Sequence, residues 1–118
     1  AAIDAYGSGG FRFADMSHRG AILCLPSGIH GWDADDAASF NDALIDRLLA
    51  ERAGADDPFS FLLFGTGRDP AGVPEPIRWR LRAVGVSLDV MTTGAAIRTF
   101  NIMLAEGRPV AAALLPVG

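Results

Sequence analysis

The fold is decided by the stretch Phe59-Ser60-Phe61-Leu62-Leu63-Phe64-Gly65-Thr66-Gly67, in the middle of the chain. Its apolar run follows Pro58 and stops at Gly65, and it is too short for a comfortable helix. A short apolar run between such residues predicts a strand that is buried on both faces. Strands of this kind are typical of sheets that carry helices on each side. We therefore predict a central strand over residues 59–64.

Amphipathic helices and further strands alternate with this strand. A helix capped by Asp35 or Asp36 and closed by Gly54 precedes it. The segments that follow are predicted as a helix over 75–84, a strand over 86–91, a helix over 94–106 and a strand over 110–115. In the last helix, either Phe100 or Ile102 is expected to face the core. The alternation predicts an α/β three-layer sandwich with a central mixed, mostly parallel sheet of about five strands.

The first third of the chain is predicted to form an N-terminal β-hairpin region. Residues 3–6 and 11–13 fit short strands, the second through its apolar-polar alternation. Residues 15–20 are polar and predict a turn, whereas the apolar residues 21–25 predict a strand that Pro26 and Gly28 end. With no linker or repeat, residues 1–118 are expected to form one domain.

Composition narrows the function classes. The net charge of −4 argues against non-specific nucleic-acid binding, which relies on positive charge. All ten basic residues are Arg, which is typical of a GC-rich genome. Cys24 is the only cysteine, so an internal disulfide or a thiolate metal cluster is excluded. No apolar stretch is long enough for a membrane-spanning helix. The chain begins at Ala1 rather than Met, which leaves a removed leader open. We expect a cytoplasmic protein without cofactor or metal, free or peripherally bound at the inner face of a membrane.

Polar residues follow two predicted strands at the same edge of the sheet. Open α/β sheets bind ligands at the carboxyl ends of their strands, and glycine-rich loops and helix N-termini present N–H groups to anions there. The alternative is a tight turn and an ordinary helix cap. The candidate ligand-binding or partner-binding residues are Gly65, Thr66, Gly67, Thr92, Thr93, Arg98 and Asn101. None of these side chains titrates near neutral pH, so no catalytic residue is predicted.

The remaining motifs give weaker evidence for a functional site. Gly7-Ser8-Gly9-Gly10 lacks the third glycine and the helix of a dinucleotide-binding loop. The acidic run at 33–36 fits helix capping better than calcium binding, and His18 and His30 have no neighbouring ligand in sequence. Ser27 lacks the flanking glycines of a nucleophile elbow. On the helix at 75–84, Arg78 and Arg82 share one face and Arg80 lies nearly opposite, which favours a solvated surface or a contact for an acidic partner.

Several short sequence motifs of this chain together resemble those of one family. They are Tyr6-Gly7, Gly9-Gly10-Phe11-Arg12-Phe13, residues 26–32, Gly65-Thr66-Gly67, Met91-Thr92-Thr93, Arg98-Thr99-Phe100-Asn101 and Glu106-Gly107-Arg108, in that order. The pattern is similar to the small α/β domain family, largely of unknown function, that includes the mitochondrial respiratory complex I (NADH:ubiquinone oxidoreductase) alpha-subcomplex assembly factor. The family often has Asp at position 92 and Tyr at position 100, where this chain has Thr92 and Phe100. Both differences remove groups that acid–base chemistry would use.

Two function hypotheses follow. The resemblance implies a non-enzymatic protein-interaction domain that helps to assemble a respiratory or other membrane complex, with a protein partner. The alternative is a small-ligand or anion-binding protein, or an enzyme, that uses the edge formed by Gly65–Gly67 and Thr92–Asn101. An interaction domain needs an exposed apolar or charged patch, whereas a ligand site needs a concave pocket with convergent polar groups.

Overall fold

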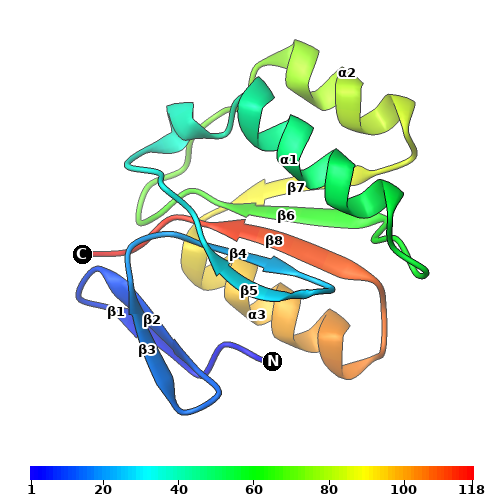
Figure 1. The fold of residues 1–118 in the computed structure, drawn as a ribbon. Helices are drawn as coiled ribbons and strands as arrows, with labels where there is room; N and C mark the ends of the chain where they lie inside the picture. The colour runs from blue at the N-terminus through cyan, green and yellow to red at the C-terminus, as the bar shows by residue number, and fades with distance from the viewer.

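The computed structural model describes all residues, 1–118, as eight strands, three α-helices and one 3₁₀ turn (Figure 1). The strands are β1 (Ala5–Gly7), β2 (Gly10–Phe13), β3 (Met16–Arg19), β4 (Ile22–Leu25), β5 (Gly28–Gly31), β6 (Phe61–Gly65), β7 (Ser87–Met91) and β8 (Val110–Leu114). The helices are α1 (Asp42–Ala53), α2 (Glu75–Ala83) and α3 (Thr93–Ala105), and the 3₁₀ turn is Ala37–Ser39.

The larger sheet has five strands in the order β5-β4-β8-β6-β7. Neighbours β8, β6 and β7 are parallel, whereas β4 is antiparallel to both β5 and β8. The predicted α/β class and the mixed five-stranded sheet are confirmed. The parallel share is smaller than predicted, because a hairpin contributes two of the five strands.

That hairpin corrects the sequence prediction at residues 28–31. Pro26 and Gly28 were expected only to end a strand, but the chain reverses there and Leu25 pairs with Gly28. Gly28 has a φ of 135°, a conformation that glycine adopts without steric cost. The turn is short, and β5 therefore returns beside β4 as an edge strand of the sheet.

The smaller sheet is antiparallel, in the order β1-β2-β3. Its third strand, Met16–Arg19, lies where the sequence predicted only a polar turn. The turn is confined to Ala14 and Asp15, whose φ angles of 48° and 61° fit a two-residue hairpin turn. The Gly7-Ser8-Gly9-Gly10 motif is likewise a hairpin turn, between β1 and β2.

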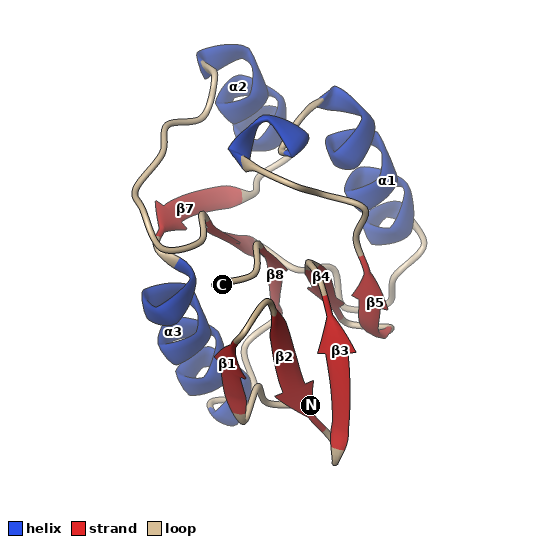
Figure 2. Ribbon diagram, turned by 90° about the vertical axis from the view of Figure 1, so that its left-hand side faces the viewer, coloured by secondary structure: helices blue, strands red, loops and turns tan.

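The five-stranded sheet has α1 and α2 on one face and α3 with the smaller sheet on the other (Figures 1 and 2). Two apolar clusters of 17 and 13 buried residues fill the two sides. On the α1 side, the ring of Phe64 stacks on that of Phe40 with 4.2 Å between centroids. Strand β6 lies inside the sheet between β8 and β7, so the strand predicted over residues 59–64 is an interior one, but it begins at Phe61 and the middle strand of the five is β8.

Helix ends refine the predicted boundaries. Asp36 caps the 3₁₀ turn instead of α1, and the Asn41 side chain caps α1 by accepting a hydrogen bond from Leu44 N–H at 3.1 Å. In α3, Phe100 is buried and Ile102 is 55% exposed, which decides between the two predicted core residues.

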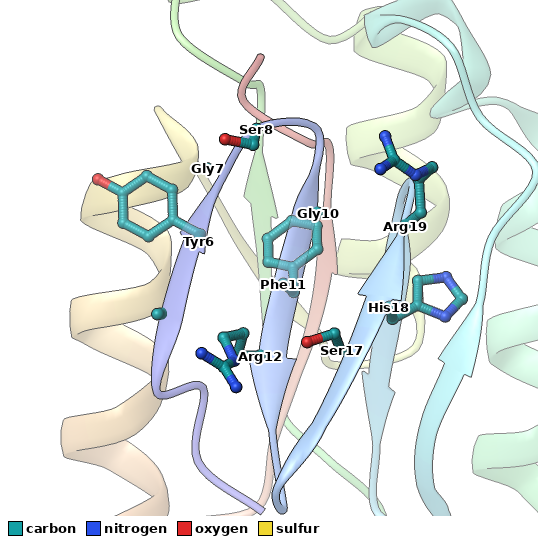
Figure 3. Close-up of a pocket in the computed structure, with 10 residues that line it drawn as sticks. Tyr6, Gly7, Ser8, Gly10, Phe11, Arg12, Ser17, His18 and Arg19 are labelled. Carbon is teal, nitrogen blue, oxygen red and sulfur yellow. The ribbon is translucent and has the colours of Figure 1, made fainter.

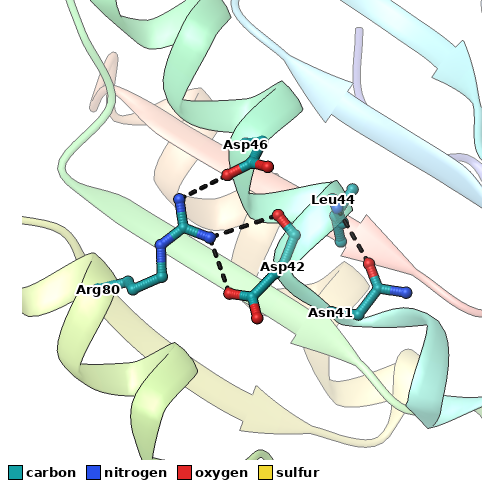
Figure 4. Close-up of polar contacts among 5 residues, drawn as sticks. All are labelled: Asn41, Asp42, Leu44, Asp46 and Arg80. Carbon is teal, nitrogen blue, oxygen red and sulfur yellow. Dashed lines mark hydrogen bonds and ion pairs between the residues drawn. The ribbon is translucent and has the colours of Figure 1, made fainter.

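Arg80 on α2 donates to the carboxylates of Asp42 and Asp46 on α1 at 2.8 and 2.6 Å (Figure 4). This ion-pair network joins the two helices.

Candidate functional site

The predicted edge of the sheet is built around a reciprocal contact between Gly67 and Thr93. Gly67 N–H donates to Thr93 Oγ1 at 2.8 Å, and Thr93 N–H donates to the Gly67 carbonyl at 2.9 Å. The Thr93 hydroxyl donates in turn to the Leu115 carbonyl at 2.7 Å. Thr93 is fully buried. Its hydroxyl therefore joins three chain segments and is already satisfied.

Gly65 and Thr66 are also engaged inside the fold. A Cβ atom at Gly65 would lie 2.9 Å from both Thr93 Oγ1 and Leu114 Cδ2, so the first turn of α3 packs where a side chain would be. Thr66 N–H donates to the Met91 carbonyl at 2.9 Å, and its hydroxyl donates to the Asp69 carbonyl at 2.7 Å. Both residues are buried. The glycines and threonines at this edge have structural partners.

Arg98 and Asn101 lie on another side of α3. The Asn101 amide accepts from Ile3 N–H at 2.9 Å and donates to the Ile3 carbonyl at 2.8 Å, which ties the N-terminal segment to α3. Arg98 is exposed beside a hollow of about 370 Å³ that Asp4, Tyr6 and Gly94 also line. The structure thus brings Gly65, Thr66, Gly67 and Thr93 together and separates Arg98 and Asn101 from them.

Thr92 directly precedes α3, and its side chain belongs to neither group. It is the N-cap residue of α3 by backbone geometry, but its side chain makes no capping hydrogen bond. It is partly exposed, so its hydroxyl stays available to solvent. Of the seven predicted residues, Thr92 and Arg98 are those with side-chain groups that no other part of the chain engages.

A broad hollow of about 510 Å³ lies on the outer face of the smaller sheet and was not predicted (Figure 3). The strand register pairs Arg12 with Ser17 and Arg19 with Gly10, which places both guanidinium groups on this face. Neither arginine takes part in an ion pair. The alternation of Phe11, Arg12 and Phe13 signalled an outward Arg12, but Arg19 lay in a segment predicted to be a turn.

Ser27, His30 and Glu51 meet at the β4–β5 turn. Ser27 Oγ lies 2.8 Å from His30 Nε2 and donates to Glu51 Oε2 at 3.0 Å. Because a hydroxyl has one hydrogen, its donation to Glu51 leaves His30 Nε2 as the donor to Ser27. A histidine in that role does not accept the serine proton as a general base would. The cluster ties the turn to α1, and His30 is less isolated than the sequence indicated.

Two further features concern membrane-spanning helices and clusters of metal ligands. None of the helices combines the length and apolar character needed to cross a membrane. No three His, Cys, Asp or Glu side chains are grouped as metal ligands.

Comparisons with known proteins match almost the whole chain. An uncharacterised protein of Rhodobacter capsulatus is 40% identical over 115 residues, which cover 98% of this chain and 84% of that protein. The human NADH dehydrogenase (ubiquinone) 1 alpha subcomplex assembly factor 3 is 27% identical over 116 residues, 97% of this chain. This chain spans 60% of the length of that assembly factor. The crystal structure of an outer membrane protein from Bartonella henselae has a TM-score of 0.90 and 50% sequence identity, with 100% and 96% of the two chains covered.

The family itself follows from a match over almost the entire sequence. The model of the family described as protein of unknown function (DUF498/DUF598) matches residues 3–115. The resemblance to the family of the complex I assembly factor is thereby confirmed. This chain belongs to the DUF498/DUF598 family.

Proposed function

We propose that this chain is a non-enzymatic protein-interaction domain that assists the assembly of a respiratory or other membrane complex. The observation that carries this proposal is the match to the assembly factors, which covers 97% of this chain. The matched segment is 60% of the assembly factors' length, so it corresponds to the domain rather than to everything those proteins contain. The interaction would take place peripherally, at the inner face of the membrane.

The geometry of the strand ends supports a role without catalysis. The hydroxyls of Thr66 and Thr93 donate to backbone carbonyls, and the Asn101 amide is bound to the backbone of Ile3. No acid or histidine side chain makes a hydrogen bond to any of them, so a general base is missing from this set. We describe the fold as a three-layer sandwich: α1 and α2 form the first layer, the five-stranded sheet the second, and α3 with the smaller sheet the third. This arrangement suits a scaffold with several exposed faces.

A second candidate function is anion binding at the predicted edge. It is favoured by the exposed Arg98 and by the Thr92 hydroxyl, which makes no capping bond at the start of α3. Gly65, Thr66, Gly67 and Thr93 would then hold the start of α3 beside Thr92, and Asn101 would anchor the N-terminal segment beside Arg98. Arg98 would supply the charge and Thr92 the hydroxyl donor.

The experiment that separates these functions starts from the tagged chain in its native cell. Purification from detergent-solubilised membranes should yield defined subunits of a membrane complex, and deletion of the gene should leave that complex incompletely assembled on native gels. A control strain should regain assembly with the wild-type gene. Normal assembly in the deletion strain, together with saturable binding of inorganic phosphate that Arg98→Ala abolishes, would favour the second function.

A further inference from the structure

Strand β7 is an edge of the five-stranded sheet, with β6 as its single neighbour. Ser87 N–H donates to the Ser60 carbonyl and the Met91 carbonyl accepts from Thr66 N–H, both at 2.9 Å, so these two residues direct their backbone groups toward the β6 side. Backbone direction alternates along a strand, and Leu88 and Val90 therefore point their N–H and C=O groups to the open side. Such a row of groups is a template for an additional strand.

One flank of this edge is cationic. Arg78 and Arg82 on α2 line a hollow of about 200 Å³ together with Val86, Ser87 and Leu88. Neither arginine forms an ion pair, whereas the third arginine of α2, Arg80, binds the acids of α1. Arg82 lies over the ring of Trp79 at 4.8 Å from the centroid, and Trp79 is 60% exposed. This flank offers two uncompensated positive charges next to an exposed aromatic ring.

The other flank of the edge differs in character. Leu88 and Val90 pack toward the cluster under α1 and α2, so Asp89 and Met91 face the side of α3. The Thr99 hydroxyl of α3 contacts Met91 Sδ at 3.8 Å, and Ile102 follows three residues later with 55% of its surface exposed. The α3 flank therefore combines an exposed apolar side chain with the acid Asp89.

We propose that the β7 edge binds an extended segment of a partner protein as a sixth strand. Its acidic side chains would face Arg78 and Arg82, and the alternate, apolar side chains would face Ile102. Alternation follows from strand geometry, and Asp89 disfavours acids on the α3 side because like charges repel. Backbone hydrogen bonds would supply affinity and the alternating side chains would supply selectivity. This inference rests on the proposed role in protein interaction and names its surface and the chemistry of the partner.

The test uses the full chain and a capped synthetic peptide with four Glu-Val repeats. In a titration followed by backbone NMR, the amide signals of Leu88 and Val90 should shift and saturate. A Lys-Val peptide of equal length should bind about tenfold more weakly or worse, because it places cations against Arg78 and Arg82. The double variant Arg78→Glu, Arg82→Glu should reverse this preference, whereas the double variant Arg12→Glu, Arg19→Glu, an equal charge change on the smaller sheet, should leave it unaltered.

A second variant tests the strand addition itself. Val90→Pro removes an outward N–H, and an edge strand tolerates proline there because that group does not bond to β6. Peptide binding should be lost while the NMR signals of the β6–β8 core remain. Equal binding of both peptides, no binding at millimolar concentration, or shifts confined to the Arg12–Arg19 hollow would each overturn the inference. So would a dimer of this chain in sedimentation that Val90→Pro dissociates, because a second copy would then cover the edge.

The same variants separate this inference from the proposed function. If the tagged wild type, the Arg78→Glu, Arg82→Glu variant and the Val90→Pro variant all purify with the same subunits, the chain is an interaction domain that uses another face, and the inference about the β7 edge is wrong. If the wild-type protein purifies with no membrane-complex subunit, and deletion of its gene leaves assembly of the complex intact, the proposed function is wrong whatever the β7 variants show.

Discussion

Gly67 and Thr93, which stand 26 residues apart, exchange two hydrogen bonds of 2.8 and 2.9 Å. Through them the loop after β6 is fixed to the first turn of α3. The Thr93 hydroxyl extends the connection to the Leu115 carbonyl, beyond the end of β8. One buried side chain thus links three segments at the carboxyl edge of the sheet. This makes Thr93 a structural residue, although the sequence presents it as a donor for a ligand.

Replacement of Thr93 by Val should destabilise the protein. The substitution keeps the shape but leaves Gly67 N–H and the Leu115 carbonyl buried without their partner, at a cost of about 2–4 kcal/mol in the free energy of unfolding. Urea denaturation of the variant measures this cost. Thr93→Ser keeps the hydroxyl and should lose about 1 kcal/mol or less. Equal stability of Thr93→Val and wild type would contradict the structural role.

Much of the fold could be predicted because its segments have strong, separate periodicities. The mostly apolar run at 59–64 predicted the interior strand, which begins at Phe61, and the apolar spacing predicted the three helices. The strands β3 and β5 were not predicted, because their residues are polar or glycine-rich. Their extended conformation depends on pairing with the neighbouring strand. In particular, Ala14 has a positive φ angle, which alanine rarely adopts, so the hairpin turn that it forms with Asp15 could not be predicted from it.

The candidate site was predicted only in part. Chain order correctly brought the Gly65–Gly67 loop and the start of α3 to one edge. Chain order could not show that the Thr93 and Thr66 hydroxyls donate their hydrogen bonds to backbone carbonyls. Nor could it fix the rotation of α3, which turns Asn101 toward Ile3. The hollow at Arg12 and Arg19 requires the register of β2 with β3, which sequence periodicity alone does not give.

Truncation of Phe64 should be among the most damaging changes in the core. Its ring is fully buried, stacks on Phe40 and meets Trp32 edge-on with 6.3 Å between centroids. Phe64→Ala should lower the free energy of unfolding by about 3–5 kcal/mol, measured by chemical denaturation. Phe61→Ala on the same strand is the matched control, since Phe61 is only half-buried. A larger loss for Phe61→Ala than for Phe64→Ala would count against the described packing.

Arg98 and Asn101 should respond differently to truncation, although they are neighbours on α3. Arg98→Ala removes an exposed side chain and should change stability by no more than about 0.5 kcal/mol. Asn101→Ala breaks both hydrogen bonds to Ile3 and should cost about 1–2 kcal/mol. Denaturation curves give both values, and hydrogen exchange of the Ile3 amide reports the release of the N-terminal segment. If Arg98→Ala unfolds the domain, Arg98 is a structural cation and not a free recognition group.

The Arg80 network should stabilise the protein in a salt-dependent way. Its guanidinium binds two carboxylates that are largely exposed, and salt screens such exposed pairs. Arg80→Gln should therefore lower the thermal midpoint at low ionic strength, and the difference from wild type should shrink in concentrated NaCl. Arg78→Gln on the same helix, which removes an unpaired charge, should show no such loss. A midpoint difference that is independent of salt would point to packing of the Arg80 stem instead.

Cys24 should make stability depend on pH in the alkaline range. Burial raises the pKa of the Cys24 thiol from its ordinary value of 9.0 to about 12, while the nearby N-terminal charge lowers it by a smaller amount. Between these two pH values the unfolded chain releases the thiol proton and the folded chain keeps it, so stability falls as pH rises, by at most about 1.4 kcal/mol per pH unit. Denaturation curves of wild type and Cys24→Ala at several alkaline pH values should diverge in slope, with the variant less sensitive. The folded thiol should also resist alkylation near neutral pH, where its thiolate fraction is negligible, and react once the chain is unfolded. Rapid modification of the folded protein, or parallel stability curves for the two proteins, would show that Cys24 is accessible and that its burial does not control the titration.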